Sequence, residues 1–308
     1  MLKILTASDL LQEVQELFDK GMHRGDKTGW VELDRLFSVV PGYWTAITGI
    51  PSHGKSTWLD NLIVNLMAQG WRFVIYSPEN QPHQIHVASL VEKITQATFR
   101  TGYPHRISAA QLCDAMAKLD ANVRFLALPE DAHSMATLDN ILERADEALD
   151  QLGDSKVGVV IDPWNELDHS RVQGMTETEF TSYELSIWRQ YNRSRETHGF
   201  IVAHPTKIQR IRHKDGSVGQ FIVPSLYDIS GSSHWFNKCD NGITVWRDED
   251  KPGTCEIHIK KIKFKHHGTT GIVMLDYDAS TGIYRDTLGY DTSRHQDMGQ
   301  RPYHHRDD

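Results

Sequence analysis

Short runs of apolar residues recur along the chain, and polar or amphipathic segments separate them. Continuous apolar runs of this length predict β-strands that are buried on both faces. They lie at 43–48, 72–76, 123–127, 157–162, 200–204 and 242–247. Between them, apolar residues recur at helical spacing and predict helices at 56–70, 83–99, 108–119 and 134–152, and a further helix that ends near His198. This alternation predicts an α/β fold with a mainly parallel twisted sheet flanked by helices.

The C-terminal part of the chain follows a different period. Residues 256–262 and 271–277 alternate between apolar and polar, and the turn Gly268-Thr269-Thr270-Gly271 separates them. This pattern predicts a C-terminal antiparallel hairpin. The stretch 205–221 is long and polar, and such loops are usually functional or disordered. Beyond Thr287 the chain is polar without an apolar period, so we expect disorder there.

An amphipathic helix is predicted from Asp9 to Lys20, with Ser8 or Asp9 as its cap. One apolar stripe carries Leu10, Val14, Leu17 and Phe18. This stripe could pack on its own domain or on a neighbouring molecule, and the sequence favours neither. We therefore divide the chain into the N-terminal helix at 1–27, a main domain at 28–286 and a tail at 287–308.

Composition indicates a globular protein of the cytoplasm. The 308 residues are 39% hydrophobic, with a mean hydropathy of −0.48, and no apolar run reaches the length of about 20 residues that a membrane span needs. The start is too soon polar for a secretory signal. Cys113, Cys239 and Cys255 lack metal-binding spacing, which suits a reducing compartment. The net charge of −8 still permits nucleic-acid binding, because local basic stripes matter more than the sum.

The strongest motif follows the first predicted strand. Gly49-Ile50-Pro51-Ser52-His53-Gly54-Lys55-Ser56 matches G-x-x-x-x-G-K-[ST], the P-loop pattern. Its backbone N–H groups and the next helix's N-terminus would cradle phosphates, Lys55 would reach the terminal phosphates, and the Ser56 hydroxyl would hold Mg²⁺. A strand before and a helix after argue against a chance glycine-rich turn. The residues expected to bind ATP are Gly49, Pro51, Ser52, His53, Gly54, Lys55, Ser56 and Thr57.

Three further residues stand at or near predicted strand ends, where ligands of parallel sheets bind. Asp162 would hold Mg²⁺ opposite Ser56, and the alternative is a carboxylate that starts a turn before Pro163. Glu79 would polarise the attacking water, and the alternative is an ordinary surface glutamate. His204 would hydrogen-bond the γ-phosphate, or it is a structural histidine.

Two basic stripes indicate anion binding, although a charge run can also be a solvated face. The first carries Lys207, Arg210, Arg212, His213 and Lys214, and the second carries Lys260, Lys261, Lys263, Lys265, His266 and His267. We expect both near the nucleotide end of the sheet. One would bind nucleic-acid phosphate, and the other would bind nucleotide phosphate of a neighbouring subunit.

With these landmarks the chain resembles the ATPase domain of ring-shaped replicative helicases of the DnaB, Twinkle and phage primase-helicase types, which have a RecA-like core. The resemblance covers about residues 8–286. It is carried by the P-loop and by Thr28-Gly29…Leu33-Asp34, Tyr76-Ser77-Pro78-Glu79, Val159-Val160-Ile161-Asp162, Val202-Ala203-His204-Pro205, Ser230-Gly231-Ser232…Cys239-Asp240, Arg247 and Lys261-Ile262-Lys263-Phe264…Gly268-Thr269-Thr270-Gly271.

The resemblance implies roles by position. Glu79 matches the catalytic glutamate and His204 the γ-phosphate sensor, while Arg247 and Tyr277 match residues that sandwich the base. The loop 207–221 matches a channel loop that holds single-stranded DNA, with Lys207, Arg210, Arg212 and Lys214 as its phosphate contacts. The stretch 231–240 matches a second channel segment, and 9–20 matches a linker helix that docks on the adjacent subunit.

Departures from the family pattern concern the seam between subunits. Lys263 stands where members usually carry an arginine finger, and Lys261 or Lys265 could share that role. Asn237 stands where phage enzymes carry a glutamine. No primase segment precedes residue 1, which implies either an excised C-terminal portion or a primase on another chain.

The resemblance implies a hexameric, ATP- and Mg²⁺-dependent DNA helicase that translocates on single-stranded DNA, in a bacterium or encoded by a phage. A RecA-like recombinase or regulatory DNA-binding ATPase without unwinding is the alternative. A nucleotide-dependent scaffold without hydrolysis is a third interpretation.

Overall fold

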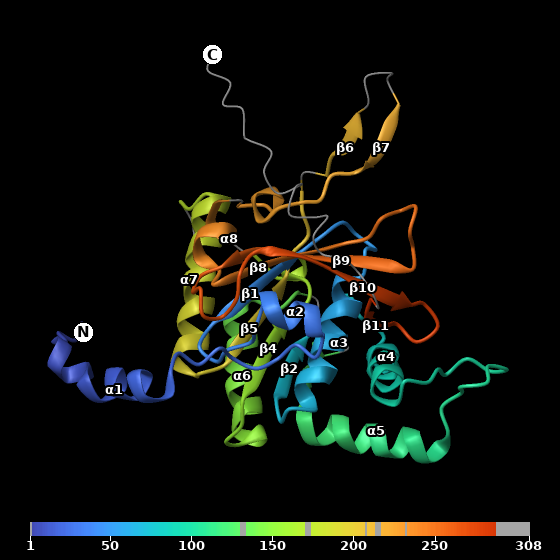
Figure 1. Cartoon of the computed structure of the whole chain (residues 1–308), viewed down its shortest axis with the longest axis horizontal. Coiled ribbons are helices and arrows are strands. Elements are labelled where there is room, and N and C mark those ends of the chain that lie inside the picture. Colours follow the sequence, from blue (N-terminus) through green and yellow to red (C-terminus); the bar gives the residue numbers. More distant parts are fainter. Residues whose placement is uncertain are drawn as a thin grey trace.

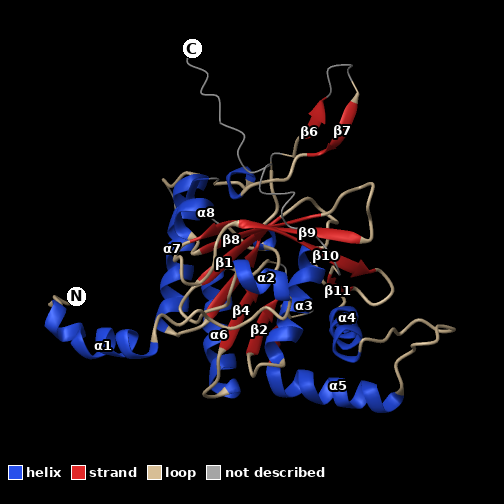
Figure 2. Cartoon of the chain, in the orientation of Figure 1, coloured by secondary structure: helices blue, strands red, loops and turns tan. Residues whose placement is uncertain are grey.

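One central sheet organises the molecule. The computed structural model describes residues 2–129, 134–169, 174–206, 208–212, 217–231 and 233–287. Within these residues the sheet has nine strands in the order β11-β10-β9-β8-β1-β5-β4-β2-β3. Figure 2 shows it as a red layer with blue helices around it. The strands are β1 (Trp44–Thr48), β2 (Arg72–Tyr76), β3 (Val123–Leu126), β4 (Val157–Ile161), β5 (His198–Val202), β8 (Asn241–Trp246), β9 (Thr254–Ile262), β10 (Gly271–Asp278) and β11 (Ile283–Asp286).

The six strands predicted from apolar runs form the parallel part of the sheet, from β3 through β2, β4, β5 and β1 to β8. The predicted α/β fold with a mainly parallel sheet is therefore confirmed. β5 begins two residues before the predicted 200–204, because side-chain hydrogen bonds accommodate His198 in the strand, and it ends at Val202. His204 consequently lies two residues beyond the strand rather than at its end.

Helices cover both faces of the sheet. On one face, α2 (Val31–Leu36), α3 (Lys55–Met67), α4 (His83–Thr95) and α5 (Ala109–Asn122) enclose a core with the side chains of Ile47, Phe73 and Phe200. On the other face, α6 (Leu138–Leu152), α7 (Glu177–Ser194) and α8 (Ser233–Lys238) enclose a second core with Trp44, Val159 and Ile201. The alternation of side chains along each strand supplies both cores.

Local caps explain where helix ends differ from prediction. α4 ends at Thr95, four residues early, because Gln96 turns into the left-handed region at φ 53°. α6 begins at Leu138 rather than Ser134, because Thr137 and Asn140 form a capping box. The helices α2 and α8 and the 3₁₀ turns η2 (Trp164–Glu166) and η3 (Leu226–Asp228) were not predicted, because each is too short to show a helical period.

The C-terminal strands determine where the second basic stripe lies. β9 pairs antiparallel with both β8 and β10, which confirms the predicted hairpin, and β11 adds a strand that was not predicted. Because β9 runs against β8, its last residue, Ile262, pairs with Asn241 at the start of β8. The residues after β9, including Lys263, therefore lie at the edge of the sheet opposite the P-loop. The prediction that both basic stripes lie near the nucleotide end is wrong for the second one.

Two elements stand away from the body in Figure 1. The stretch predicted as a polar loop contains the hairpin of β6 (Arg210–Arg212) and β7 (Val218–Phe221).

The second of these elements is the N-terminal segment, in which η1 (Ala7–Leu10) leads into α1 (Leu11–Lys20) and no residue is buried. Thr6 caps this segment, and Asp9 completes its capping box, so the predicted cap at Ser8 or Asp9 is wrong. The predicted disordered tail lies, apart from Thr287, outside the described residues.

No helix among the described residues has both the length and the apolar content needed to cross a bilayer.

His198 should make stability depend on pH. Its ring is fully buried and bonds Thr45 Oγ1 at 2.9 Å and the Val40 carbonyl at 2.7 Å. Burial lowers its pKa from 6.5 to about 4. The unfolded chain therefore binds this proton at a higher pH than the folded chain. As the pH falls from about 6.5 to about 4, the free energy of unfolding should decrease by up to roughly 3 kcal/mol.

Chemical denaturation between about pH 7 and 4 checks this, with His198→Asn as the variant that cannot take up the proton. The parent should lose stability more steeply than the variant over this range. Equal slopes would show that His198 does not contribute.

Candidate nucleotide-binding site

The P-loop joins β1 to α3 in a conformation that needs its two glycines. Gly49 has φ 152°, and a Cβ there would lie 2.1 Å from the Val245 carbonyl oxygen. Gly54, the N-cap of α3, has φ 89°, and a Cβ there would lie 2.4 Å from the Tyr284 hydroxyl. Neither position can carry a side chain, so the backbone approaches its neighbours as a phosphate-binding loop must.

Lys55 supplies a buried cation at the centre of this loop. Its Nζ donates to the carbonyls of Gly49 at 3.0 Å and Ile50 at 3.1 Å, and the residue is 4% exposed. Burial lowers the pKa of Lys55 to about 8, while the nearby carboxylates of Asp162 and Glu79 favour its charged form. The loop therefore holds a poorly solvated positive charge at the N-terminus of α3, which suits an anion such as a triphosphate.

Asp162 lies directly after β4, beside the first turn of α3. The carboxylate is buried, and the neighbouring Ser56 side chain acts to lower its pKa. Burial raises its pKa to about 6, and the nearby Asp60 contributes in the same direction. A neighbouring hydroxyl and carboxylate are the oxygen ligands that Mg²⁺ prefers, so these two residues fit a magnesium ion that also binds phosphate.

Glu79 and His204 meet at the same edge. His204 Nε2 lies 3.3 Å from Glu79 Oε1, and the His204 backbone N–H donates to Asn165 Oδ1 at 2.7 Å. Burial, followed by the charge of Lys55, lowers the pKa of His204, while Glu79 opposes this effect. The turn that presents Glu79 is fixed because Ser77 donates to the Asp162 carbonyl at 3.0 Å. Lys55, Asp162, Glu79 and His204 thus gather from the ends of four parallel strands.

Arg247 and Tyr277 also reach this edge, but they contact each other. The Arg247 guanidinium lies 4.2 Å from the centre of the Tyr277 ring. Stacked planes are about 3.5 Å apart, so a base would enter between them only after they separate. Tyr284 adds a contact that sequence reasoning missed, because Arg247 donates to its hydroxyl at 3.3 Å. The apolar pair Ile283-Tyr284 after the Thr281-Gly282 turn was the available signal for this last strand.

The described residues of the first basic stripe, Arg210 and Arg212, lie on strand β6 of the β6–β7 hairpin. The Arg210 guanidinium binds Glu249 through two contacts of 2.9 Å and lies 3.6 Å from the Phe221 ring centre, so its charge is partly neutralised. Arg212 is exposed on the same strand. Lys207 and Lys214 lie outside the described residues.

The second basic stripe lies at the far edge. Lys263 Nζ bonds the buried Asp240 carboxylate at 2.8 Å. Lys261 donates to carbonyls at the end of α8, including Cys239 at 2.7 Å, where a cation complements the helix dipole. Asn237 is exposed on α8 and also lies away from the P-loop.

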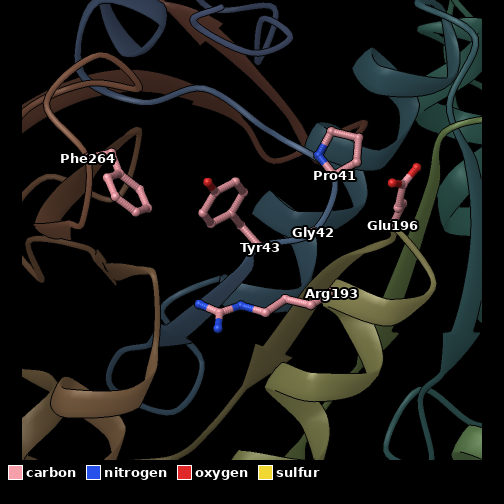
Figure 3. Close-up of a pocket in the computed structure, with 6 residues that line it drawn as sticks. All are labelled: Pro41, Gly42, Tyr43, Arg193, Glu196 and Phe264. Carbon is pink, nitrogen blue, oxygen red and sulfur yellow. The ribbon is translucent and has the colours of Figure 1, made fainter. Parts of the chain in front are cut away.

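A hollow of about 460 Å³ opens beside Lys263, between the start of β1 and the end of α7. Figure 3 shows Tyr43 between Phe264 and Pro41, with the Arg193 side chain running alongside. Arg193 also lies 3.8 Å from Asp240. The far edge therefore carries positive charge and aromatic side chains well away from the chain's own P-loop.

Comparisons with known proteins agree with this geometry. The chain is 37% identical to a Twinkle homologue of Arabidopsis thaliana, named as chloroplastic and mitochondrial, over 296 residues. This chain is similar to Twinkle-type proteins. The match covers 93% of the chain but only 40% of that relative's length. The predicted resemblance to the DnaB and Twinkle group is confirmed, while no protein-family model matches the chain.

Solved structures share the fold of this chain. One solved ATPase domain has a TM-score of 0.74 at 15% identity, over 92% of this chain and 100% of that one. A DnaB-like replicative helicase, described with its primase interactions, has a TM-score of 0.72 at 15% identity, over 93% and 68%. The RadB recombinase has a TM-score of 0.54 at 13% identity, over 85% and 99%. At these identities the likeness concerns the fold alone, and it confirms the predicted RecA-like core.

Proposed function

We propose that this chain is the ATP-hydrolysing motor domain of a ring-shaped DNA helicase. The observation that carries the proposal is a complete P-loop site, with Lys55, Asp162 and Glu79 together, in a chain that is 37% identical to a Twinkle homologue. The fold shared with a DnaB-like replicative helicase supports it. Among the described residues, no feature of the site favours another reaction class.

Within the site each group has a distinct task. The P-loop and Lys55 would bind the β- and γ-phosphates, and Ser56 and Asp162 would hold the magnesium ion. Bound Mg²⁺ would neutralise charge on the phosphates. Glu79 polarises the attacking water, and His204, which contacts Glu79, responds to loss of the γ-phosphate.

The far-edge position of Lys263 motivates a shared site. Because Lys263 lies opposite its own P-loop, it can act only on a nucleotide held by another copy. A repeated head-to-tail contact of this kind closes into a ring or continues as a filament. The exposed apolar stripe of α1, with Val14 57% and Phe18 83% exposed, suits docking on that neighbour. We propose six copies, with the segment 231–240, which contains Asn237, as a second segment that lines the channel.

The β6–β7 hairpin is proposed to hold single-stranded DNA in the central channel. Arg212 is an exposed cation on this hairpin, and Lys207 and Lys214 extend the basic stripe in the sequence. Arg210 is also proposed as a contact, although Glu249 shares its charge. Contacts to phosphate alone give binding without sequence preference. A primase is proposed as a further partner, and a bacterial cytoplasm, cellular or phage-infected, as the location.

A RecA-like recombinase or a regulatory DNA-binding ATPase is the second candidate function. The fold that the chain shares with the RadB recombinase supports this candidate. Electron microscopy with an ATP analogue and single-stranded DNA separates the two. A closed ring around one strand supports the helicase, and an open filament on DNA supports the recombinase.

Unwinding of a forked DNA duplex tests the proposed function directly. The parent should separate the strands with ATP and Mg²⁺, while Lys55→Ala should lose unwinding, because the cation that contacts the terminal phosphates is missing. Unwinding by Lys55→Ala at the parental rate would refute the assignment. Hydrolysis without any unwinding would favour the regulatory ATPase.

A further inference from the structure

We infer that Tyr284 is a positioning residue that holds Arg247 for contact with the nucleotide base and ties this contact to the P-loop. The inference rests on the proposed nucleotide site and deepens it. Tyr284 comes from β11, the last described strand, and it falls within a few residues of the predicted tail. Nothing in the P-loop pattern indicates that a residue so far along the chain reaches the loop.

The Tyr284 hydroxyl stands between the two parts of the site. It accepts a hydrogen bond from Arg247 at 3.3 Å and donates to the carbonyl of Gly54 at 3.4 Å. Gly54 immediately precedes Lys55, so one hydroxyl joins the residue proposed to contact the base to the loop that binds phosphate. Burial raises the pKa of Tyr284, which keeps the hydroxyl protonated and able to donate.

The backbone of Tyr284 is fixed from two sides. Its N–H donates to Asn61 Oδ1 at 3.2 Å on α3, and its carbonyl accepts from Trp30 Nε1 at 3.0 Å. The residue is 3% exposed, and its ring lies 4.9 Å from that of Tyr277. A hydroxyl carried on such a rigid base can define the position of a flexible arginine side chain.

Arg247 is held at a second point by the P-loop itself. Its backbone N–H donates to His53 Nδ1 at 3.0 Å. Burial, with the charges of Arg247 and Lys55, lowers the pKa of His53, so the ring stays neutral and Nδ1 remains an acceptor. His53 thus fixes the start of the Arg247 side chain, and Tyr284 fixes its end.

The Nε donor of the Arg247 side chain indicates a ligand. Among the described residues, the buried Nε atom of Arg247 has no hydrogen-bond partner. A buried donor without an acceptor is unfavourable, and such groups in native proteins usually await water, an ion or a ligand. A nucleotide base or ribose has acceptor atoms that can reach this donor once the Arg247 guanidinium and the Tyr277 ring have separated.

Binding of ATP and of inorganic triphosphate, both with Mg²⁺, tests the inference. Tyr284→Phe keeps the ring and loses only the hydroxyl, so ATP binding should weaken about five- to tenfold, the value of one or so hydrogen bonds, while triphosphate binding should stay within about twofold. Tyr183→Phe is the matched control, because it removes an exposed hydroxyl on α7. This variant should change neither ATP binding nor triphosphate binding.

A double-mutant cycle makes the test independent of general stability. If Tyr284 acts through Arg247, the variants Tyr284→Phe and Arg247→Gln remove the same interaction with the nucleotide. The loss of ATP affinity in the double variant should therefore be smaller than the sum of the two single losses. Equal losses of ATP and triphosphate affinity, additive losses, or no loss would overturn the inference. A parent that binds neither ligand would overturn the proposed function together with the inference, which distinguishes the two failures.

Discussion

A Glu79→Gln variant should bind ATP with nearly parental affinity and hydrolyse it about 10²–10⁴ times more slowly. Glutamine has the shape of glutamate and can still hydrogen-bond His204, so the turn between Ser77 and Asn80 should keep its geometry. The amide lacks the negative charge needed to take a proton from water. The loss should therefore appear in kcat with little change in KM.

Steady-state hydrolysis with single-stranded DNA, alongside equilibrium ATP binding, measures this effect. Glu143→Gln is a suitable control, because Glu143 is exposed on α6 and its replacement removes the same charge away from the site. If Glu79→Gln turned over at the parental rate, the water-polarising group would have to be sought elsewhere at this edge, and Glu79 would be an ordinary surface residue.

Replacing Lys263 by alanine should remove DNA-stimulated hydrolysis while ATP binding persists. A cation that reaches the γ-phosphate from a neighbouring copy stabilises charge only in the transition state, and arginine fingers of this kind contribute about 10³–10⁵-fold. Lysine lacks the planar fork of arginine, so we expect a smaller loss, of about 10²-fold or more. Lys263→Arg should retain turnover or increase it for the same reason.

The pairing of Lys263 with Asp240 calls for a stability control. Asp240 is 1% exposed, and Lys263→Ala removes its nearest cation, leaving Arg193 at 3.8 Å. Thermal unfolding should therefore be recorded beside turnover, and Lys265→Ala should be measured in parallel. Unchanged turnover in Lys263→Ala, with a loss in Lys265→Ala, would move the finger to Lys265.

The sequence predicts the parallel part of the fold well, because buried parallel strands appear as continuous apolar runs. The run 157–162 and the P-loop identify β4, β1 and the residues that follow them. Glu79 and Asp162 could be found in this way, since both stand just after such runs. His204 was found as well, although the polar His198 conceals the true start of β5.

What the sequence does not predict depends on strand direction and on contacts between distant segments. The edge occupied by Lys263 follows from the antiparallel pairing of β9 with β8, which an alternating pattern alone does not fix in space. The contact of Tyr284 with Gly54 joins residues 230 positions apart. The pairing of Arg210 with Glu249 likewise arises only in the folded chain, so the sequence overstates how available the stripe is to DNA.

Two neighbouring copies are proposed to share each ATP, with Glu79 from one and Lys263 from the next. Mixing the Glu79→Gln and Lys263→Ala proteins, followed by measurement of DNA-stimulated ATP hydrolysis, tests this most directly. In mixed rings about a quarter of the contacts should pair an intact Glu79 with an intact Lys263, so the mixture should hydrolyse ATP well above either protein alone. A mixture that co-assembles, as native mass measurement would show, yet is no more active than its separate components would contradict the shared site.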